Sequence, residues 1–219
     1  IMHISVLNLL KIKKEIELKQ LNQKNQTEII AVSKRFELEQ INPLIEFGHT
    51  NFGENQVQEA IKKWSNIKRQ NDKIKLHMIG KLQTNKVKYA IPLFDYIHSL
   101  DNLKLAEKIS SEQKKNNKEL KIFIQVNIGN EIQKSRIKPD DVKNFYLKCT
   151  NDLKLNIVGL MCIPPISNNV KTYFDKMLEL KKLTDLKELS MGMSADYLQA
   201  LEFGSSFIRI GSKIFGPRV

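Results

Sequence analysis

The chain has 219 residues, 41% of them hydrophobic, and a formal net charge of +12. This length and composition suit one soluble globular domain, residues 1–219, with a sizeable core. Because no segment approaches the ~20 apolar residues that span a bilayer and no leader pattern opens the sequence, we expect a cytoplasmic protein without a membrane partner.

The basic charge makes nucleic acid a candidate partner. The lysines are mixed with Glu and Asp over helix-like segments at residues 11–19, 62–73 and 171–187. A compositional preference for lysine is therefore as good an explanation of the charge as binding. No basic tract studded with aromatic residues is present. We therefore expect no nucleic-acid partner, and the alternative predicts RNA binding that weakens steeply with salt.

Short apolar runs alternate with amphipathic helical patterns from residue 28 onward, and residues 6–21 before them read as an additional helix. Eight β-then-α pairs favour an α/β fold of the (β/α)8 TIM-barrel class over an open doubly wound sheet. The candidate strands are residues 28–34, 50–53, 76–80, 96–100, 122–128, 157–163, 189–193 and 207–210.

A lysine ends the first of these strands, which reads Ile29-Ile30-Ala31-Val32-Ser33-Lys34. The carboxyl ends of barrel strands are where this fold places its chemistry, so Lys34 is a candidate functional residue. The alternative is that Lys34 is the first solvated residue after a buried strand.

The segments after the seventh and eighth strands contain small and hydroxyl residues, among them Ser194, Gly211 and Ser212. In a barrel these loops commonly hold a phosphate, which needs close backbone N–H groups and hydroxyl donors. The alternative treats the glycines as turn residues and the serines as helix caps.

A phosphate site together with a lysine suggests a phosphorylated aldehyde held as a Schiff base, for which pyridoxal phosphate is the common cofactor. Arg209 ends the eighth strand and could face the ring nitrogen. An arginine there discourages protonation of that nitrogen and weakens the ring as an electron sink, which suits racemisation or storage. The alternative for Arg209 is a structural ion pair on the rim.

The chain resembles the pyridoxal phosphate homeostasis proteins, relatives of the N-terminal barrel of alanine racemase. The resemblance spans most of the chain and rests on Ala31-Val32-Ser33-Lys34, Phe52-Gly53-Glu54-Asn55, Ile79-Gly80, Leu82-Gln83, Asn85-Lys86, Gln125-Val126-Asn127, Gly159-Leu160-Met161 and the segments 189–196 and 209–216.

This resemblance implies a barrel in which Lys34 carries pyridoxal 5′-phosphate as a Schiff base. Ser194, Gly211 and Ser212 match positions that hold the phosphate, Arg209 matches the residue facing the ring nitrogen, and Asn55 lies in a matching pocket motif. Family members are regarded as carriers or regulators of the cofactor pool that affect amino-acid and keto-acid metabolism. The chain departs from the family at residues 133–136, where Gln-Lys-Ser-Arg replaces a Ser-Lys-Ser-Gly-like stretch.

A pyridoxal phosphate-dependent amino-acid racemase is the alternative function. Alanine racemases of this fold use a second domain that contributes a catalytic tyrosine, so here a substitute base has to come from Tyr89, Tyr96 or Tyr197. We expect a monomer without turnover whose further partners are pyridoxal phosphate-dependent apoenzymes. No metal site is expected, because the cysteines and histidines are scattered at Cys149, Cys162, His3, His49, His77 and His98.

Overall fold

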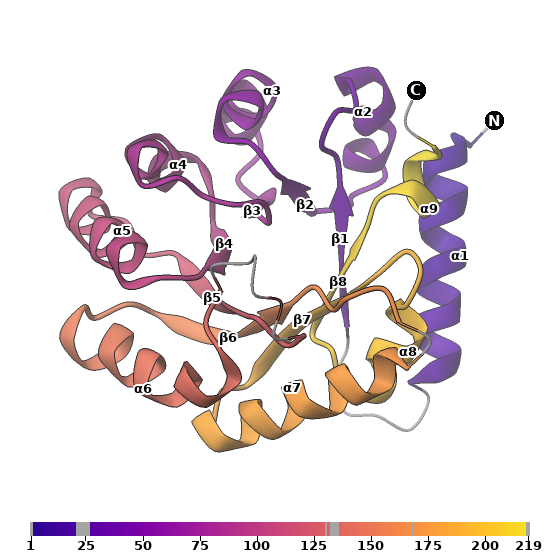
Figure 1. Cartoon of the computed structure of the whole chain (residues 1–219). Coiled ribbons are helices and arrows are strands. Elements are labelled where there is room, and N and C mark those ends of the chain that lie inside the picture. The colour runs from indigo at the N-terminus through magenta and orange to yellow at the C-terminus, as the bar shows by residue number, and fades with distance from the viewer. Residues whose placement is uncertain (1, 21–26, 130, 132–135, 168, 218–219) are drawn as a thin grey trace.

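Eight parallel strands close into a barrel in the computed structural model, which describes residues 2–20, 27–129, 131, 136–167 and 169–217. Each strand pairs with the next, and the last pairs with the first to complete the ring (Figure 1). The predicted (β/α)8 barrel is confirmed. The strands are β1 Glu28–Val32, β2 Asn51–Glu54, β3 Lys75–Met78, β4 Tyr96–Leu100, β5 Lys121–Val126, β6 Ile157–Cys162, β7 Glu188–Met193 and β8 Phe207–Ile210.

Helices follow the strands and form the outer layer of the barrel (Figure 1). They return the chain to the same end of the sheet, which keeps neighbouring strands parallel. The α-helices are α1 Ile4–Lys19, α2 Leu38–Glu46, α3 Val57–Gln70, α4 Val87–Leu93, α5 Leu103–Asn116, α6 Val142–Leu147, α7 Val170–Thr184, α8 Tyr197–Glu202 and α9 Ser212–Phe215, with shorter turns η1 Thr84–Lys86, η2 Pro139–Asp141 and η3 Lys148–Asp152.

Both faces of the barrel wall are buried, and successive residues of a strand point to opposite faces. On β1, Ile30 faces an inner cluster, whereas Ile29 and Ala31 belong to the larger cluster between the wall and the helices. This explains why the strands read as continuous apolar runs. The inner cluster contains Ile30, Phe123, Met161 and Phe207.

The N-terminal helix α1 packs along the outside of the barrel against α2, α8 and α9. Its buried residues recur at helical spacing as Val6, Leu9, Ile12 and Ile16. The additional helix predicted from the sequence is therefore confirmed, although it begins at Ile4 and ends at Lys19. Residue 21, the expected last residue, lies outside the described part of the chain.

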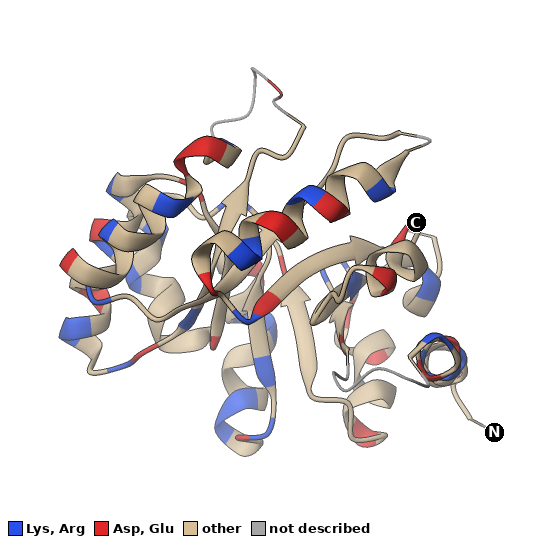
Figure 2. Ribbon diagram, turned by 90° about the horizontal axis from the view of Figure 1, so that it is seen from below, with Lys and Arg blue, Asp and Glu red and all other residues tan. Residues whose placement is uncertain are grey.

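Basic and acidic residues are interspersed over the outer helices (Figure 2). Glu202 of α8, for example, pairs with Lys19 of α1 at 3.0 Å and with Lys171 of α7 at 2.5 Å. The lysine-rich helices are therefore mixed-charge surfaces, as their sequences indicate. Among the described helices, none is long and apolar enough to cross a membrane.

Candidate functional site

The carboxyl ends of four neighbouring strands carry the residues expected from the sequence. Ile30 of β1 is in register with Arg209 of β8, Arg209 is in register with Met193 of β7, and β1 also pairs with β2. The ends of these strands therefore meet at one rim of the barrel. The residues that follow them there are Lys34, Asn55, Ser194 and Gly211.

Lys34 lies half-buried in the turn after β1, which ends at Val32 and not at the lysine as predicted. The ladder to β2 continues for one bond, since Ser33 N donates to the carbonyl oxygen of Gly53 at 3.0 Å. The chain then turns, because Phe36 N donates to the Ser33 carbonyl oxygen at 3.1 Å. The lysine thus leaves the sheet within a tight turn at the rim.

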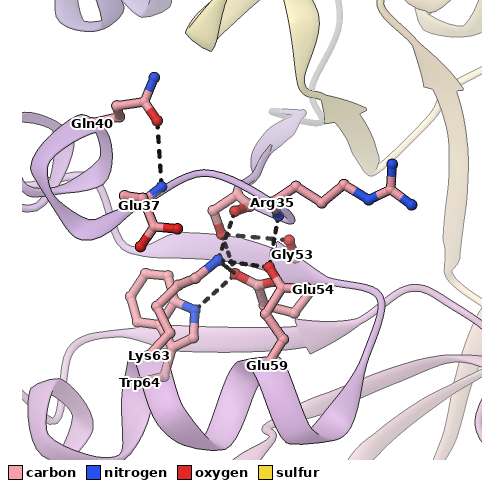
Figure 3. Close-up of polar contacts among 9 residues, drawn as sticks. Arg35, Glu37, Gln40, Gly53, Glu54, Glu59, Lys63 and Trp64 are labelled. Carbon is pink, nitrogen blue, oxygen red and sulfur yellow. Dashed lines mark hydrogen bonds and ion pairs between the residues drawn. The ribbon is translucent and has the colours of Figure 1, made fainter. Parts of the chain in front are cut away.

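The residue before Lys34 is tied to a buried carboxylate (Figure 3). Ser33 Oγ donates to Glu54 Oε1 at 2.7 Å, and the same oxygen accepts from Trp64 Nε1 at 2.9 Å and from Lys63 Nζ at 3.0 Å. Lys63 Nζ also donates to the Ser33 carbonyl oxygen at 2.8 Å. Both the side chain and the backbone of Ser33 are therefore anchored to β2 and α3.

The residue after Lys34 is held by the same helix. Arg35 N donates to Glu59 Oε1 at 2.6 Å, and Glu59 pairs with Lys63 at 3.0 Å (Figure 3). Arg35 has φ of 62°, in the left-handed region that side chains seldom adopt. Hydrogen bonds from α3 therefore fix the turn on both sides of Lys34.

Glu54 is fully buried, and burial raises the pKa of its carboxyl group. Lys63, Trp64 and Ser33 act in the opposite direction by stabilising the charged form. The second oxygen, Oε2, has no hydrogen-bond partner among the described residues. Burial of this carboxylate costs free energy. The hydrogen bonds from Ser33, Lys63 and Trp64, which also hold the Lys34 turn, offset that cost.

Arg209 is 4% exposed and occupies the inner side of the barrel near the rim. Its Nη1 donates to Ser190 Oγ at 2.6 Å and its Nη2 donates to the carbonyl oxygen of Cys162 at 2.8 Å. Burial lowers the pKa of Arg209, but a guanidinium remains charged in proteins. Both hydrogen-bond acceptors are neutral, and among the described residues no ion pair of Arg209 is present, although the Asp196 carboxylate acts on it electrostatically.

Strand β7 bends at its penultimate residue, Gly192, which has φ of 92° and leads into the loop. A Cβ at Gly192 would lie 2.7 Å from the Cβ of Ala200, so only glycine fits there. Met193 N then donates to Asp196 Oδ1 at 2.6 Å across the turn that contains Ser194. Ser194 is half-buried in this turn.

The loop after β8 passes through the buried Gly211 into the short helix α9, whose first residue is the exposed Ser212. Ile214 N and Phe215 N donate to the Gly211 carbonyl oxygen at 2.9 and 3.0 Å. The N–H groups of Ser212 and Lys213, which precede these two donors in the first turn, have no acceptor inside the helix. Donors of the kind that a phosphate requires are thus present at this end of β8.

Asn55 lines a cavity of about 310 Å³ beyond the ends of β2 and β3. A Cβ at Gly80 would lie 2.4 Å from the Asn55 carbonyl oxygen, so glycine permits this close approach of the two strand ends. Of the six expected site residues, Asn55 alone lines this cavity within the described chain. The other described residues lining it are Gln56, Val57, Gln58, Met78, Lys81, Gln83 and Lys86.

Sequence spacing did not reveal the residues that surround Arg209. Ser190, His98 and His77 are all fully buried, and His98 Nδ1 lies 2.9 Å from Ser190 Oγ. These residues come from β7, β4 and β3, so their proximity depends on the closed barrel. The sequence placed all three residues in predicted strands. Because successive residues of a strand point to opposite faces, some polar strand residues must face the interior, and this was the only signal.

The described residues contain no group of three His, Cys, Asp or Glu side chains placed to hold a metal ion. Cys149 and Cys162 are buried free thiols. Burial raises the pKa of each to about 12, so neither supplies a thiolate near neutral pH. Of the segment 133–136, residues 133–135 lie outside the described part of the chain.

Comparison with known proteins agrees with the fold and with the motifs. The family described as alanine racemase, N-terminal domain, matches residues 8–219. A pyridoxal phosphate homeostasis protein of Aquifex aeolicus is 37% identical over 203 residues, which are 89% of this chain and 88% of the relative.

Solved structures show the same barrel. PipY of Synechococcus elongatus is 30% identical, with a TM-score of 0.86 without PLP, over 98% of this chain and 100% of that one. With PLP bound, the TM-score is 0.79 over 94% and 100% of the two chains. Alanine racemase of Clostridium difficile, at 13% identity, a TM-score of 0.73 and 98% coverage of this chain, shares the fold alone, and this chain covers 56% of it. The chain belongs to the alanine racemase N-terminal domain family and, within it, to the pyridoxal phosphate homeostasis proteins.

Proposed function

We propose that this chain binds pyridoxal 5′-phosphate, holds it as a Schiff base on Lys34, and acts in intracellular homeostasis of the cofactor and thereby in amino-acid and keto-acid balance. The Lys34 amine condenses with the cofactor aldehyde and releases water. Support comes from the homeostasis-protein relatives and from PipY, which was solved with PLP. The proposal covers residues 1–219 as one cofactor-binding domain, a cytoplasmic monomer that passes the cofactor to apoenzymes.

The observation that carries this proposal is the buried cation of Arg209 on the strand beside β1. The hydrogen-bond partners of this guanidinium are neutral, and of the charged groups that act on it Asp196 is negative and Arg136 positive, so positive charge remains at the rim and favours an anionic ligand. Gly211 adds room, because a Cβ there would meet Val32 only at an ordinary 3.5 Å. Its missing side chain therefore leaves space at the rim that the protein does not fill. These features fit a phosphorylated pyridine aldehyde.

Each residue then has a distinct role. Ile30 faces the barrel interior and Ser33 bonds toward α3, and Lys34 follows them in the turn at the rim, where its amine meets the cofactor aldehyde. Ser194, Gly211 and Ser212 bind the phosphate, Arg209 faces the ring nitrogen, and Asn55 contacts the bound cofactor. When bound, pyridoxal phosphate supplies an aldehyde and an electron-withdrawing ring, and Arg209 keeps that ring nitrogen unprotonated.

A racemase requires a second base near the rim, and the three candidate tyrosines are poorly placed to supply one. Tyr89 is exposed on α4, and Tyr96 begins β4 at the opposite end of the barrel. Tyr197 donates its hydroxyl to Glu15 of α1, and burial and this carboxylate raise its pKa. The placement of these tyrosines supports a carrier over a two-base racemase.

The test is the absorbance spectrum of the purified protein with added pyridoxal phosphate. The wild type should show the yellow Schiff-base band, and Lys34→Ala should lose it while circular dichroism remains unchanged. Lys75→Ala, which removes an exposed lysine at the opposite end of the barrel, is the matched control and should keep the band. A band that persists in Lys34→Ala refutes the assignment.

A further inference from the structure

A chain of hydrogen bonds runs through the barrel from Arg209 to the opposite end. Arg209 Nη1 lies 2.6 Å from Ser190 Oγ, and Ser190 Oγ lies 2.9 Å from His98 Nδ1. His98 Nε2 then lies 2.9 Å from His77 Nδ1, and His77 Nε2 lies 2.9 Å from Asn51 Oδ1. Side chains of five strands are thereby joined in one line.

The direction of every bond in this line follows from its two ends. Arg209 can only donate, so Ser190 Oγ accepts from it, which leaves Ser190 able either to donate to or to accept from His98 Nδ1. At the other end, Asn51 Nδ2 donates to Glu28 Oε2 at 3.2 Å, which leaves Asn51 Oδ1 as the acceptor for His77 Nε2–H. With neutral rings, this end requires the Nε2–H tautomer at both histidines, so the Ser190 hydroxyl donates to His98 Nδ1.

Neutral histidines satisfy this order, whereas a doubly protonated His77 would set its Nδ1–H against Nε2–H of His98, and a doubly protonated His98 would deprive the Ser190 hydroxyl of its acceptor. His77 and His98 are fully buried, and burial lowers the pKa of both well below the ordinary value. The charged and titratable groups that act on His77 are Lys68, Lys121 and His49, and those that act on His98 are His77 and Arg209; all of them disfavour protonation.

Aromatic contacts hold the two imidazoles in the planes that the bonds need. His77 stacks on Tyr96 with ring centroids 4.2 Å apart, and His98 stacks on Phe123 at 4.4 Å. Phe207 closes the cluster edge-on to His98 at 6.0 Å. The rings therefore have little freedom to rotate and break the line.

We propose that Ser190, His98 and His77 are positioning residues that fix the orientation of the Arg209 guanidinium at the barrel mouth, so that its remaining N–H groups point at the ring nitrogen of the bound ligand. This inference rests on the proposed function. Arg209 stays protonated because of its own high pKa, and the line restrains the plane in which its guanidinium lies. A cofactor with a protonated or alkylated ring nitrogen then meets a fixed donor and loses this hydrogen bond.

The first test is made on the wild-type protein without added cofactor. Histidine side-chain ¹⁵N NMR should show the Nε2–H tautomer for both His77 and His98, unchanged as the pH falls from 8 to 6. An Nδ1–H tautomer or a doubly protonated ring at either position in this range overturns the inference. This readout is independent of cofactor binding and of any variant.

The second test compares His98→Phe, His98→Gln and Tyr96→Phe with added pyridoxal phosphate. His98→Phe should keep the Lys34 band but bind the cofactor about tenfold more weakly and shift the pH midpoint of its absorbance. It should also weaken the discrimination against N-methylated pyridoxal phosphate, because the guanidinium is still a donor but is no longer fixed in orientation. His98→Gln should restore wild-type behaviour because an amide both donates and accepts, and Tyr96→Phe, which leaves the line intact, should resemble the wild type.

Two failures are distinguishable. If the wild type develops no band with pyridoxal phosphate, the proposed function is refuted. If the wild type has the band but His98→Phe gives a superimposable titration and unchanged discrimination, the positioning role is refuted while the proposed function stands.

Discussion

At the scale of single residues, Glu54 has a structural task next to the proposed cofactor lysine. It is a buried carboxylate whose one oxygen accepts from Ser33, Lys63 and Trp64. Lys63 then also bonds the backbone of Ser33. The position of Lys34 at the rim depends on this anchor.

Removing the anchor should destabilise the protein strongly. Glu54→Ala leaves the ammonium of Lys63, whose side chain is only 9% exposed, without its buried partner. We expect the free energy of unfolding, measured by urea denaturation, to fall by about 3–5 kcal/mol. Glu59→Ala is the matched control, since its carboxylate is more exposed and its loss should cost about 1 kcal/mol. Equal losses in the two variants would show that burial of Glu54 is not the cause.

At the scale of elements, the turn after β7 combines backbone strain with close packing against α8. Gly192 and Gly204 both have positive φ, of 92° and 70°. Only Gly192 also faces a neighbour, because a Cβ at Gly204 would meet nothing within 4 Å. The two positions therefore separate the cost of strain from the cost of packing.

Gly204→Ala should lower the free energy of unfolding by about 1–2 kcal/mol through backbone strain alone. Gly192→Ala should cost about 1–3 kcal/mol more, since its Cβ is forced against Ala200. It should also weaken cofactor binding by displacing the Ser194 turn. Urea denaturation and titration with pyridoxal phosphate measure both effects. If Gly192→Ala is no worse than Gly204→Ala, the packing contribution is absent.

The elements themselves could be predicted because periodicity is a local property. The run before Lys34 reads as a strand from its apolar residues, and Val6, Leu9, Ile12 and Ile16 mark α1 by their spacing. The end of β1 was misplaced because the turn depends on bonds to α3, a contact that periodicity does not encode.

The chain of hydrogen bonds from Arg209 to Asn51 could not be predicted from the sequence, for a related reason. His98 and Ser190 are 92 residues apart, and only closure of the barrel makes them neighbours. Scattered histidines were taken as isolated, but His77 and His98 touch because β3 pairs with β4. Arg209 was found from its place at a strand end, whereas its neutral partners required the fold.

At the scale of the whole molecule, the barrel encloses neutral histidines where an apolar filling is common. Burial lowers the pKa of His49 to about 4, and that of His77 and His98 well below the ordinary value. The unfolded chain therefore binds protons at these residues below pH ~6.5, whereas the folded chain does not. Stability conferred by their neutral state is complete above this pH and is lost as the pH falls.

We expect the free energy of unfolding to decrease from pH 7.5 to 5.5, with each buried histidine contributing up to about 1.4 kcal/mol per pH unit below ~6.5. Burial raises the pKa of Glu54 and Glu188, which gives a slope of opposite sign at lower pH. Urea denaturation at several pH values measures the slope, and His49→Gln should reduce it. A stability that is flat from pH 7.5 to 5.5 contradicts neutral burial of these residues.

Peptide mapping after hydride reduction shows directly whether Lys34 carries the cofactor. The protein is incubated with pyridoxal phosphate, reduced with borohydride to fix the Schiff base as a stable amine, digested and examined by mass spectrometry. We expect the pyridoxyl phosphate mass on the peptide that contains Lys34. An adduct confined to another lysine, or no adduct, would show that Lys34 is not the attachment site.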